Sequence, residues 1–248
     1  MTKKDAITVY FGGDAKELWT GDGLHIVYSG RLAALARRDG SGQWRAEAHF
    51  PACSGNVKPD YNAASKEQAL AARLNTRDCP DLTLAYFQTA ANAGEALLGC
   101  KVDAGALPCL STLNVRGGLD ALILPELLRL LLDEWRLSWG DSVDIISNCT
   151  IYMAKECLCV PLPAIAALTP RGARLIEAVD EKLRGVLRDA FPGDWRRMES
   201  GAILSENTVD LGRLSAVMCG RVICAKELKA GNLRTLYTVM PGKFEEDS

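Results

Sequence analysis

The chain has 248 residues, of which 48% are apolar and 24% charged, and its formal net charge at pH 7 is −2. These values predict one soluble globular domain of moderate size, or two small ones, and exclude disordered and fibrous proteins. Proteins that hold nucleic acid usually carry a clear basic excess. The sequence pI near 5.8 therefore argues against nucleic-acid binding as the main role.

The cysteines are scattered along the chain and form no C-x-x-C pair. Their only close spacing is a single C-x-C, so we expect buried thiols in a reducing compartment rather than a metal site or a disulfide framework. The nine are Cys53, Cys79, Cys100, Cys109, Cys149, Cys157, Cys159, Cys219 and Cys224.

The apolar stretch at 6–11 is shorter than the core of a signal peptide and ends at Gly12-Gly13. No run approaches the roughly 18 apolar residues of a membrane-spanning helix. We therefore expect no signal peptide and no transmembrane segment. The predicted location is an intracellular, reducing compartment, either the cytoplasm or an organelle reached through a presequence that has been removed.

Residues 22–50 are predicted to form β structure. Apolar runs at 24–28, 31–37 and 44–50 are typical of strands, and the Gly-rich polar turn at 39–42 between the last two predicts a hairpin.

Two helices are predicted next, at 63–74 and 82–98, after a loop that contains Pro51 and Pro59. A short buried strand is expected at 110–114. From there the chain becomes mainly helical.

The first helix of this second half has leucines at helical spacing up to Trp135, with Pro125 in its first turn. A second helix is predicted to be capped by Asp141 or Ser142. Its apolar positions are Val143, Ile146 and Ile151.

Pro161, Pro163 and Pro170 are expected to interrupt the chain before a third helix at 171–190, which ends at the Phe-Pro-Gly-Asp motif. The apolar face of this helix is formed by Leu175, Val179, Leu183 and Val186. Apolar stretches at 211–228 and 233–240 follow.

Few residues suggest chemistry. Both histidines, His25 and His49, alternate with apolar neighbours and are interpreted as strand-face residues rather than catalytic bases. No nucleotide-binding loop, nucleophile elbow or zinc-protease motif occurs. We predict no catalytic, cofactor-binding or metal residues.

Other polar and aromatic groups are given structural interpretations. The side chains of adjacent acids on a helix point in different directions, so we expect them on solvated faces rather than as acid and base partners. Two tryptophans one helical turn apart are expected to be core or interface anchors. Paired glycines are expected to form turns. A paired arginine is interpreted as surface. These groups are Asp133-Glu134 and Asp180-Glu181, Trp135 and Trp139, Gly12-Gly13 and Gly117-Gly118, and Arg196-Arg197.

The order of motifs resembles part of the glycogen/starch (α-glucan) phosphorylases. That family has I-P-E-L-M-R-I-L-x-D, a helix-opening tryptophan, and T-x-x-Y-T-N-H-T; this chain has L-P-E-L-L-R-L-L-L-D at 124–133, then Trp139, then T-I-Y at 150–152. The family's F-P-G-D and R-R-M-S are similar to F-P-G-D-W-R-R-M-E-S at 191–200.

Weaker similarities extend over about 220 residues. The family's closing segment is loosely similar to the stretch from K-E-L-K at 226–229 to Tyr237, and to P-G-K-F at 241–244. Its F-Y-G-R-V strand is similar to 27–32, and its Y-F-x-x-A-A helix to Tyr86-Phe87 and the alanines that follow.

The departures from the family pattern bear on activity. Residues 114–120 replace the family's N-D-T-H-P loop and are about two residues longer, while 153–156 read M-A-K-E in place of T-N-H-T. The segment before Tyr86 is shorter than the family's, which would delete the loop that gates its active site. With no histidine after His49, the family's substrate-contacting histidines have no counterpart in this half.

The resemblance implies an α/β fold. We expect one domain over 1–248, a divergent and truncated piece of a phosphorylase N-terminal lobe: a reduced Rossmann-like domain, similar to the N-terminal lobe of GT-B enzymes, with a β-hairpin region and a helical second half. Residues 1–80 form its strand-rich part and 81–248 its mainly helical part. In the family, the lobe with the lysine that binds pyridoxal phosphate lies beyond the matched segment, so no cofactor is expected here.

The main functional hypothesis is a catalytically inactive structural or scaffold subunit of a larger protein assembly. A lobe without its partner is expected to expose apolar surface that can serve as an interface. The alternatives are one half of a split α-glucan phosphorylase and a non-catalytic glucan-binding regulatory domain. In the latter, Trp19, Trp44 and Trp195 could stack on sugars.

Overall fold

The computed structural model describes residues 6–21, 23–49, 61–76, 79–154, 157–224 and 231–246. Its elements fall into a strand-rich first part and an α/β second part, which we call the body. The first part contains β1 (Ile7–Phe11), β2 (Asp14–Thr20), β3 (Gly23–Ser29), β4 (Leu32–Arg38), β5 (Trp44–Ala48), α1 (Tyr61–Leu74) and α2 (Asp81–Leu98).

The body mixes helices with short strands. In chain order it contains η1 (Ala104–Ala106), α3 (Leu107–Leu110), β6 (Leu113–Val115), η2 (Gly118–Leu122), α4 (Ile123–Arg129), the π-helical turn η3 (Leu130–Glu134), α5 (Trp139–Cys149), β7 (Thr150–Ala154), β8 (Cys159–Pro161), α6 (Leu162–Leu168), α7 (Pro170–Ala190), α8 (Trp195–Gly201), β9 (Leu204–Ser205), β10 (Thr208–Asp210), α9 (Leu211–Met218), β11 (Arg221–Cys224), α11 (Arg234–Val239), η4 (Pro241–Lys243) and β12 (Phe244–Glu246).

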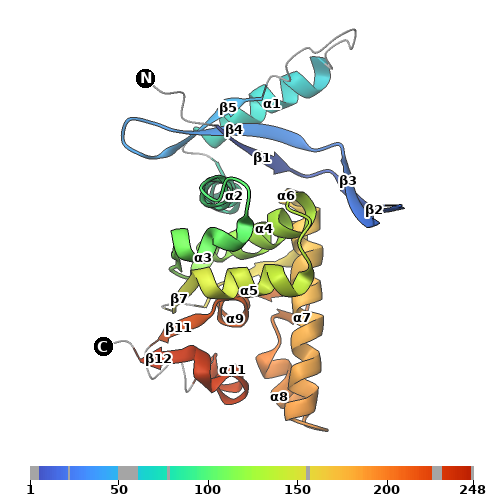
Figure 1. The fold of residues 1–248 in the computed structure, drawn as a ribbon, viewed down its shortest axis with the longest axis vertical. Helices are drawn as coiled ribbons and strands as arrows, with labels where there is room; N and C mark the ends of the chain where they lie inside the picture. Colours follow the sequence, from blue (N-terminus) through green and yellow to red (C-terminus); the bar gives the residue numbers. More distant parts are fainter. Residues whose placement is uncertain are drawn as a thin grey trace.

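The molecule is elongated. In Figure 1, β1, β4, β5 and α1 lie at one end and β11, β12 and α11 at the other, and the long helix α7 runs along one side of the body. The strands β2 and β3 project sideways from the first part.

A four-stranded parallel sheet lies within the body, in the order β12-β11-β7-β6. Tyr152 of β7 pairs with Val115 of β6 on one side and Val222 of β11 on the other. All three side chains are buried. Parallel strands are connected by helical crossovers, which explains why each of these strands is separated from the next by at least one helix.

The core of the body is apolar. Leucines of α4 are fully buried because the helix packs against α2, α5 and α7. The largest side chains with almost no exposure are Phe87, Leu107, Leu122, Leu124, Leu127, Leu128, Leu131, Ile146, Tyr152, Ile165, Ile176 and Leu187.

The first part has two antiparallel sheets, β1-β4-β5 and the two-stranded β2-β3 ribbon. Small alanines on β4 let helices pack closely on the three-stranded sheet, with α1 against β4 and β5, and α2 against β1. One contact is polar, because the Ala33 amide donates to Glu67 Oε1 at 3.0 Å. Gly94 of α2 sits so close to Ile7 that an added Cβ would lie 2.5 Å from Cγ2 of that side chain.

Charged and aromatic side chains join the ribbon to the body. The Arg31 guanidinium lies between two rings, 3.9 Å from the centroid of Tyr10 and 3.8 Å from that of Tyr28. The Tyr28 hydroxyl donates to Asp133, and Arg171 donates two hydrogen bonds to the same carboxylate at 3.0 and 3.1 Å. Burial and this hydrogen bond raise the pKa of Tyr28 to about 12.

Most predicted elements are confirmed. The strands at 24–28, 31–37 and 44–50 correspond to β3, β4 and β5, with β4 and β5 forming the hairpin; Phe50 lies outside the described residues. The helices at 63–74, 82–98 and 171–190 correspond to α1, α2 and α7. An α/β fold is therefore correct, and the second part contains a parallel sheet as well as helices.

Two strands of the first part were not predicted, nor were the short strands β7 to β12 of the body. The apolar stretch at 6–11 forms β1, and 14–20 forms β2. Gly12 and Gly13 join them with positive φ angles of 62° and 78°, as a turn requires. The sequence does not reveal β2 because most of its side chains are exposed.

The helical predictions in the body were wrong in three details. Ser138, rather than Asp141 or Ser142, caps α5 and accepts from the Asp141 amide at 3.1 Å. Ile151 lies in β7, since the helix ends at Cys149. The segment 130–134 forms a π-turn, so Trp135 and Trp139 do not share one regular helix.

The region around the prolines also differs from expectation. Pro163 lies in the first turn of α6, where a proline is tolerated, so a short helix forms between the predicted breaks. Val186 is exposed, unlike the other apolar positions expected on that face of α7. The strand expected at 110–114 begins at Leu113 because Leu110 ends α3.

In each acid pair one member is exposed, as expected, and the other is buried: Glu134 and Glu181 lie on the surface, whereas the carboxylates of Asp133 and Asp180 do not. The Asp133 side chain is only 1% exposed because Arg171 and Tyr28 surround it. Asp180 is also buried: it binds Arg184 and accepts the Ile203 amide at 2.7 Å. The local sequence shows Arg184 four residues after Asp180, but it indicates neither Arg171 beside Asp133 nor the Ile203 amide beside Asp180.

The cysteines are free thiols in the described residues. Five are buried as expected, whereas Cys109 and Cys159 are exposed. Cys53 lies outside the described residues.

Candidate functional site

The carboxyl edge of the parallel sheet is the candidate site. Ligands of open α/β sheets bind beyond the carboxyl ends of parallel strands. Here β6 is followed by Arg116 and by Gly117 and Gly118, whose φ angles of 92° and 58° are left-handed. After this loop η2 packs against α9, and α9 also contacts β7.

Three polar atoms converge on the first turn of α9. A Cβ added to Gly212 would lie 3.1 Å from Cys157 Sγ, 3.2 Å from Asp210 Oδ1 and 3.2 Å from Tyr152 Oη. These distances are closer than ordinary van der Waals contact. A glycine at this position therefore leaves room for the three polar groups to meet.

Two buried polar atoms of this cluster lack hydrogen bonds. Tyr152 Oη and Arg213 Nε are the buried side-chain atoms without a hydrogen-bond partner in the described residues. Arg213 Nε lies 3.3 Å from Asp210 Oδ2, which is within ion-pair distance, but the two atoms do not form a hydrogen bond. Such atoms are rare in native proteins and each calls for an explanation, of which ligand binding is one.

The remaining contacts hold the cluster in place. Asp210 accepts the Arg213 amide at 3.0 Å and so caps α9, and Arg213 Nη1 donates to the Ala202 carbonyl at 2.8 Å. The Leu211 amide donates to the carbonyl of Leu158 at 3.0 Å, which fixes the start of the helix beside β8.

The chemistry of the cluster is hydrogen bonding. Burial raises the pKa of Tyr152 well above its usual range, and the neighbouring Cys157 and Asp210 raise it further. The phenol therefore keeps its proton and is able to donate a hydrogen bond, while Asp210 accepts the Arg213 amide. A mixture of neutral donor, cation and carboxylate suits a ligand with hydroxyl groups. In the described residues no group of three His, Cys, Asp or Glu side chains could hold a metal ion.

The residues singled out from sequence lie elsewhere. His25 is on β3 and His49 follows β5, so both belong to the first part. The ring of Trp44 is covered by Arg38 at 4.0 Å, and its Nε1 donates to Asn92 at 2.8 Å.

Trp19 and Trp195 are exposed but lie on β2 and α8, two separate elements. Arg196 and Arg197 are on the surface, as expected. The three tryptophans therefore do not form a shared sugar platform.

Sequence reasoning missed Asp210, Gly212 and Arg213. A signal was present, because Asp-Leu-Gly-Arg after an apolar residue is typical of a capped helix start. Tyr152 was recognised only as a motif match. Its lack of a hydrogen-bond partner depends on tertiary structure and cannot be read from sequence.

Fold and site together define an α/β protein with a polar cluster at the carboxyl edge of a parallel sheet. A model of the family described as "Carbohydrate phosphorylase" matches residues 85–248, and the chain belongs to this family. Glycogen phosphorylase of Bacillus subtilis (strain 168) is 30% identical over 134 residues, which are 50% of this chain and 17% of that protein.

The muscle forms of glycogen phosphorylase from Ovis aries and Homo sapiens are more distant. Each is 25% identical over 138 residues, covering 50% of this chain and 16% of the relative. The match thus spans about a sixth of the length of these relatives. Among the described residues, no helix has the length and apolar character needed to cross a membrane.

Proposed function

We propose that the chain is a catalytically inactive phosphorylase-family protein that acts as a structural subunit of a larger protein assembly. The observation that carries this proposal is the β2-β3 ribbon. Trp19 is 75% exposed and Leu18 50%, and Leu24 and Val27 on the other strand are also exposed. Large apolar side chains gathered on a projecting element are typical of interaction surfaces.

The geometry of the ribbon supports contact on both faces. Trp19 pairs with Leu24, and side chains alternate along a strand, so these two share one face while Leu18 and Val27 lie on the other. Within the described residues β2 and β3 pair only with each other. Their outer edges therefore offer backbone groups to a partner strand.

The sheet edge supports the inactive interpretation. Its Tyr152 keeps its proton, and Asp210 is engaged by the Arg213 amide and guanidinium. Such groups can bind a ligand, but they do not form an acid and base pair of the kind that proton transfer needs. A reduced Rossmann-like lobe of the GT-B type stays part of this proposal, supported by the parallel sheet and its helical crossovers. A reducing compartment is likewise proposed, supported by the free thiols.

The experiment compares matched tryptophan variants. Native extracts are fractionated by size, and the proteins that co-migrate with the tagged full chain are identified and quantified. We expect stoichiometric recovery in a large complex, loss of that complex for the double variant Leu18→Ser/Trp19→Ser, and retention for Trp195→Ser, which removes another exposed ring outside the ribbon.

Two results would contradict the proposal. One is a wild-type chain that elutes as a free monomer. The other is release of glucose 1-phosphate from glycogen by the purified chain, which would show catalysis. Co-elution with a second phosphorylase-like chain, together with that activity, would favour the split enzyme.

A second candidate function is non-catalytic glucan binding at the sheet edge. The specific observation in its favour is that Tyr152 Oη and Arg213 Nε are buried without hydrogen bonds. Glucan hydroxyls could accept from both. Tyr152→Phe removes only the hydroxyl and should weaken retention in a glycogen-containing native gel about three- to tenfold. Trp195→Ser should migrate as wild type, and equal retention of all three proteins would exclude this site.

A further inference from the structure

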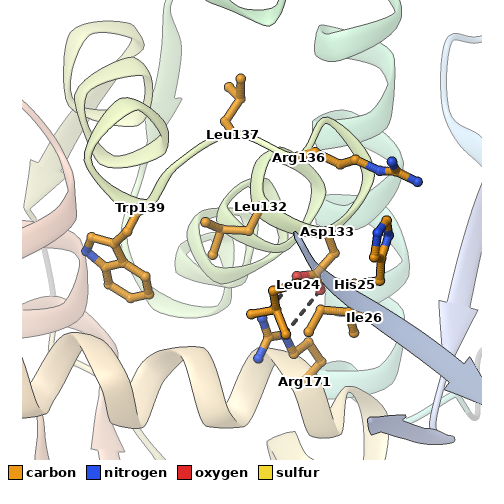
Figure 2. A pocket seen from close by; sticks show the side chains of 9 residues that line it. All are labelled: Leu24, His25, Ile26, Leu132, Asp133, Arg136, Leu137, Trp139 and Arg171. Atoms are coloured by element: carbon orange, nitrogen blue, oxygen red, sulfur yellow. Dashed lines mark hydrogen bonds and ion pairs between the residues drawn. The ribbon is translucent and has the colours of Figure 1, made fainter. Parts of the chain in front are cut away.

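A separate cavity lies between the ribbon and the body. Its volume is about 310 Å³, and β3, the π-turn η3, the segment leading into α5 and the start of α7 form its walls. Figure 2 shows Trp139 at one end of the lining and Arg136 and His25 at the other, with the Asp133–Arg171 ion pair between them. None of these residues belongs to the sheet-edge cluster.

The backbone beside this cavity has an unusual conformation. The Trp135 amide donates to the Leu130 carbonyl at 3.0 Å, a π-helical bond, and the Leu137 amide donates to that of Leu131 at 3.0 Å. Arg136 between them has a φ of 57°, in the left-handed region that non-glycine residues seldom adopt. π-Turns and residues of this kind cost free energy and are concentrated at functional sites.

The charges in the cavity are unequal. Asp133 is satisfied by Arg171 and Tyr28, so this carboxylate and Arg171 together form a neutral pair. Arg136 is exposed and makes no ion pair within the part of the chain that the structure describes. Among the side chains that line the cavity, Arg136 is therefore the one cation without an ion-pair partner, and His25 adds a ring that can donate a hydrogen bond at the same end.

The opposite end of the cavity is apolar. The indole of Trp139 is a ring of the kind on which aromatic rings stack, and the side chain of Leu132 adds apolar contact. Lys182 Nζ lies 5.1 Å from the centroid of the same indole. Ligand pockets range upward from about 300 Å³, so a volume of about 310 Å³ fits a ligand with one ring rather than an extended oligosaccharide.

We propose that this cavity binds a small aromatic anion, with its ring against Trp139 and its anionic group at Arg136 and His25. The shared chemistry is one ring and one acidic group, which is either a carboxylate or a phosphate. Arg136 is the residue that recognises charge. Arg136 and Trp139 lie in the short irregular segment between η3 and α5. The strained backbone of this segment directs both side chains to the same cavity.

The experiment measures binding of four probes to the full chain by calorimetry. Benzoate and phenyl phosphate carry both features, benzyl alcohol has the ring alone, and inorganic phosphate has the charge alone. We expect at least one aromatic anion to bind about tenfold more tightly than benzyl alcohol or inorganic phosphate. The stronger of the two aromatic anions identifies the acidic group.

Variants test the assigned residues. Arg136→Gln should weaken the aromatic anion about tenfold and leave benzyl alcohol unchanged. Arg188→Gln, on the exposed far end of α7, changes net charge equally and should bind as wild type. His25→Gln tests the contribution of the ribbon to the same polar end of the cavity. Thermal melting checks that each variant folds. Absence of binding by both aromatic anions at millimolar concentration, or equal weakening by Arg136→Gln and Arg188→Gln, would overturn the proposal.

Discussion

The body and the β2-β3 ribbon are held in place by different interactions. In the body, leucines of α4 and the strands of the parallel sheet pack into a core with almost no exposure. The β2-β3 ribbon instead meets the body through Tyr28 and Arg171 on Asp133, and through Arg174, which donates to the Ala15 carbonyl at 3.0 Å. The body thus depends on buried apolar area, and the attachment of the ribbon depends on charge and hydrogen-bond geometry.

The difference has energetic consequences. Burial of apolar surface is insensitive to pH and to the exact direction of each contact. A buried ion pair instead requires both partners, because removing one leaves an uncompensated charge in a low-dielectric environment. The body also contains a buried ion pair, formed by Glu126 and Arg129 of α4 near the ribbon.

The largest expected effect is that of Arg129→Leu. Arg129 donates to Glu126 at 2.7 and 3.0 Å and to Glu134 at 2.9 Å, and both members of the first pair are buried. Its loss should lower the free energy of unfolding by about 3–5 kcal/mol in urea titrations. The double variant Glu126→Gln/Arg129→Leu should recover much of this loss. A single-variant effect below about 1 kcal/mol would contradict the interpretation.

Leu128→Ala examines the apolar core. The side chain is fully buried, so the cavity left behind should cost about 2–5 kcal/mol, measured by the same titration. Leu110→Ala is the matched control, because that leucine is 59% exposed. Similar losses for the two variants would mean that the core repacks around the change.

Tyr28→Phe examines the junction between ribbon and body. Loss of the hydrogen bond to Asp133 should cost about 1–2 kcal/mol near neutral pH. The folded-state pKa of Tyr28 is raised to about 12 from 10.0, so the unfolded chain releases this proton first. Its stabilising contribution is complete below pH 10 and is lost as the pH rises toward 12.

The pH dependence of the urea midpoint checks this sign. Wild-type stability should decline between pH 10 and 12, and Tyr28→Phe should decline less steeply. Some decline persists in the variant because the pKa values of Tyr86 and Tyr152 are raised as well. Parallel curves for the two proteins would show that Tyr28 does not contribute.

The smallest effect is expected at the surface of the hairpin. Arg37 Nε lies 2.7 Å from Glu47 Oε2, but the side chains are 38% and 54% exposed. Glu47→Gln should therefore change stability by less than about 1 kcal/mol, and the change should shrink further at high salt. A larger loss would mean that hairpin stability depends on this pair.

The predictable features of this chain are local. The hairpin β4-β5 follows from alternation around a Gly-rich turn, and α7 from apolar residues at helical spacing. The family follows from short motifs in one order, and residues 85–248 match its model. In each case neighbouring residues carry the whole signal.

The unpredicted features depend on distant partners. Asp133 is buried because Arg171 reaches it from another helix, and Asp180 because the Ile203 amide does. The cluster of Tyr152, Gly212 and Arg213 forms only when α9 packs against β7. Local sequence shows an adjacent acid pair or a lone tyrosine in each case and gives no sign of its environment.

The π-turn Leu130–Glu134 decides which changes in length this segment of the chain can accept. A π-turn holds about one residue more per turn than an α-helix, so deleting one residue would restore α-helical bonding and leave the following residues in nearly the same orientation. Inserting one residue, or deleting two, would instead rotate every following residue by about 100° relative to α4. Natural variation in chain length should accordingly be tolerated in the hairpin turn at 39–42 and limited at 130–134 to the loss of one residue, because any other change would move Trp139 away from the cavity that it lines.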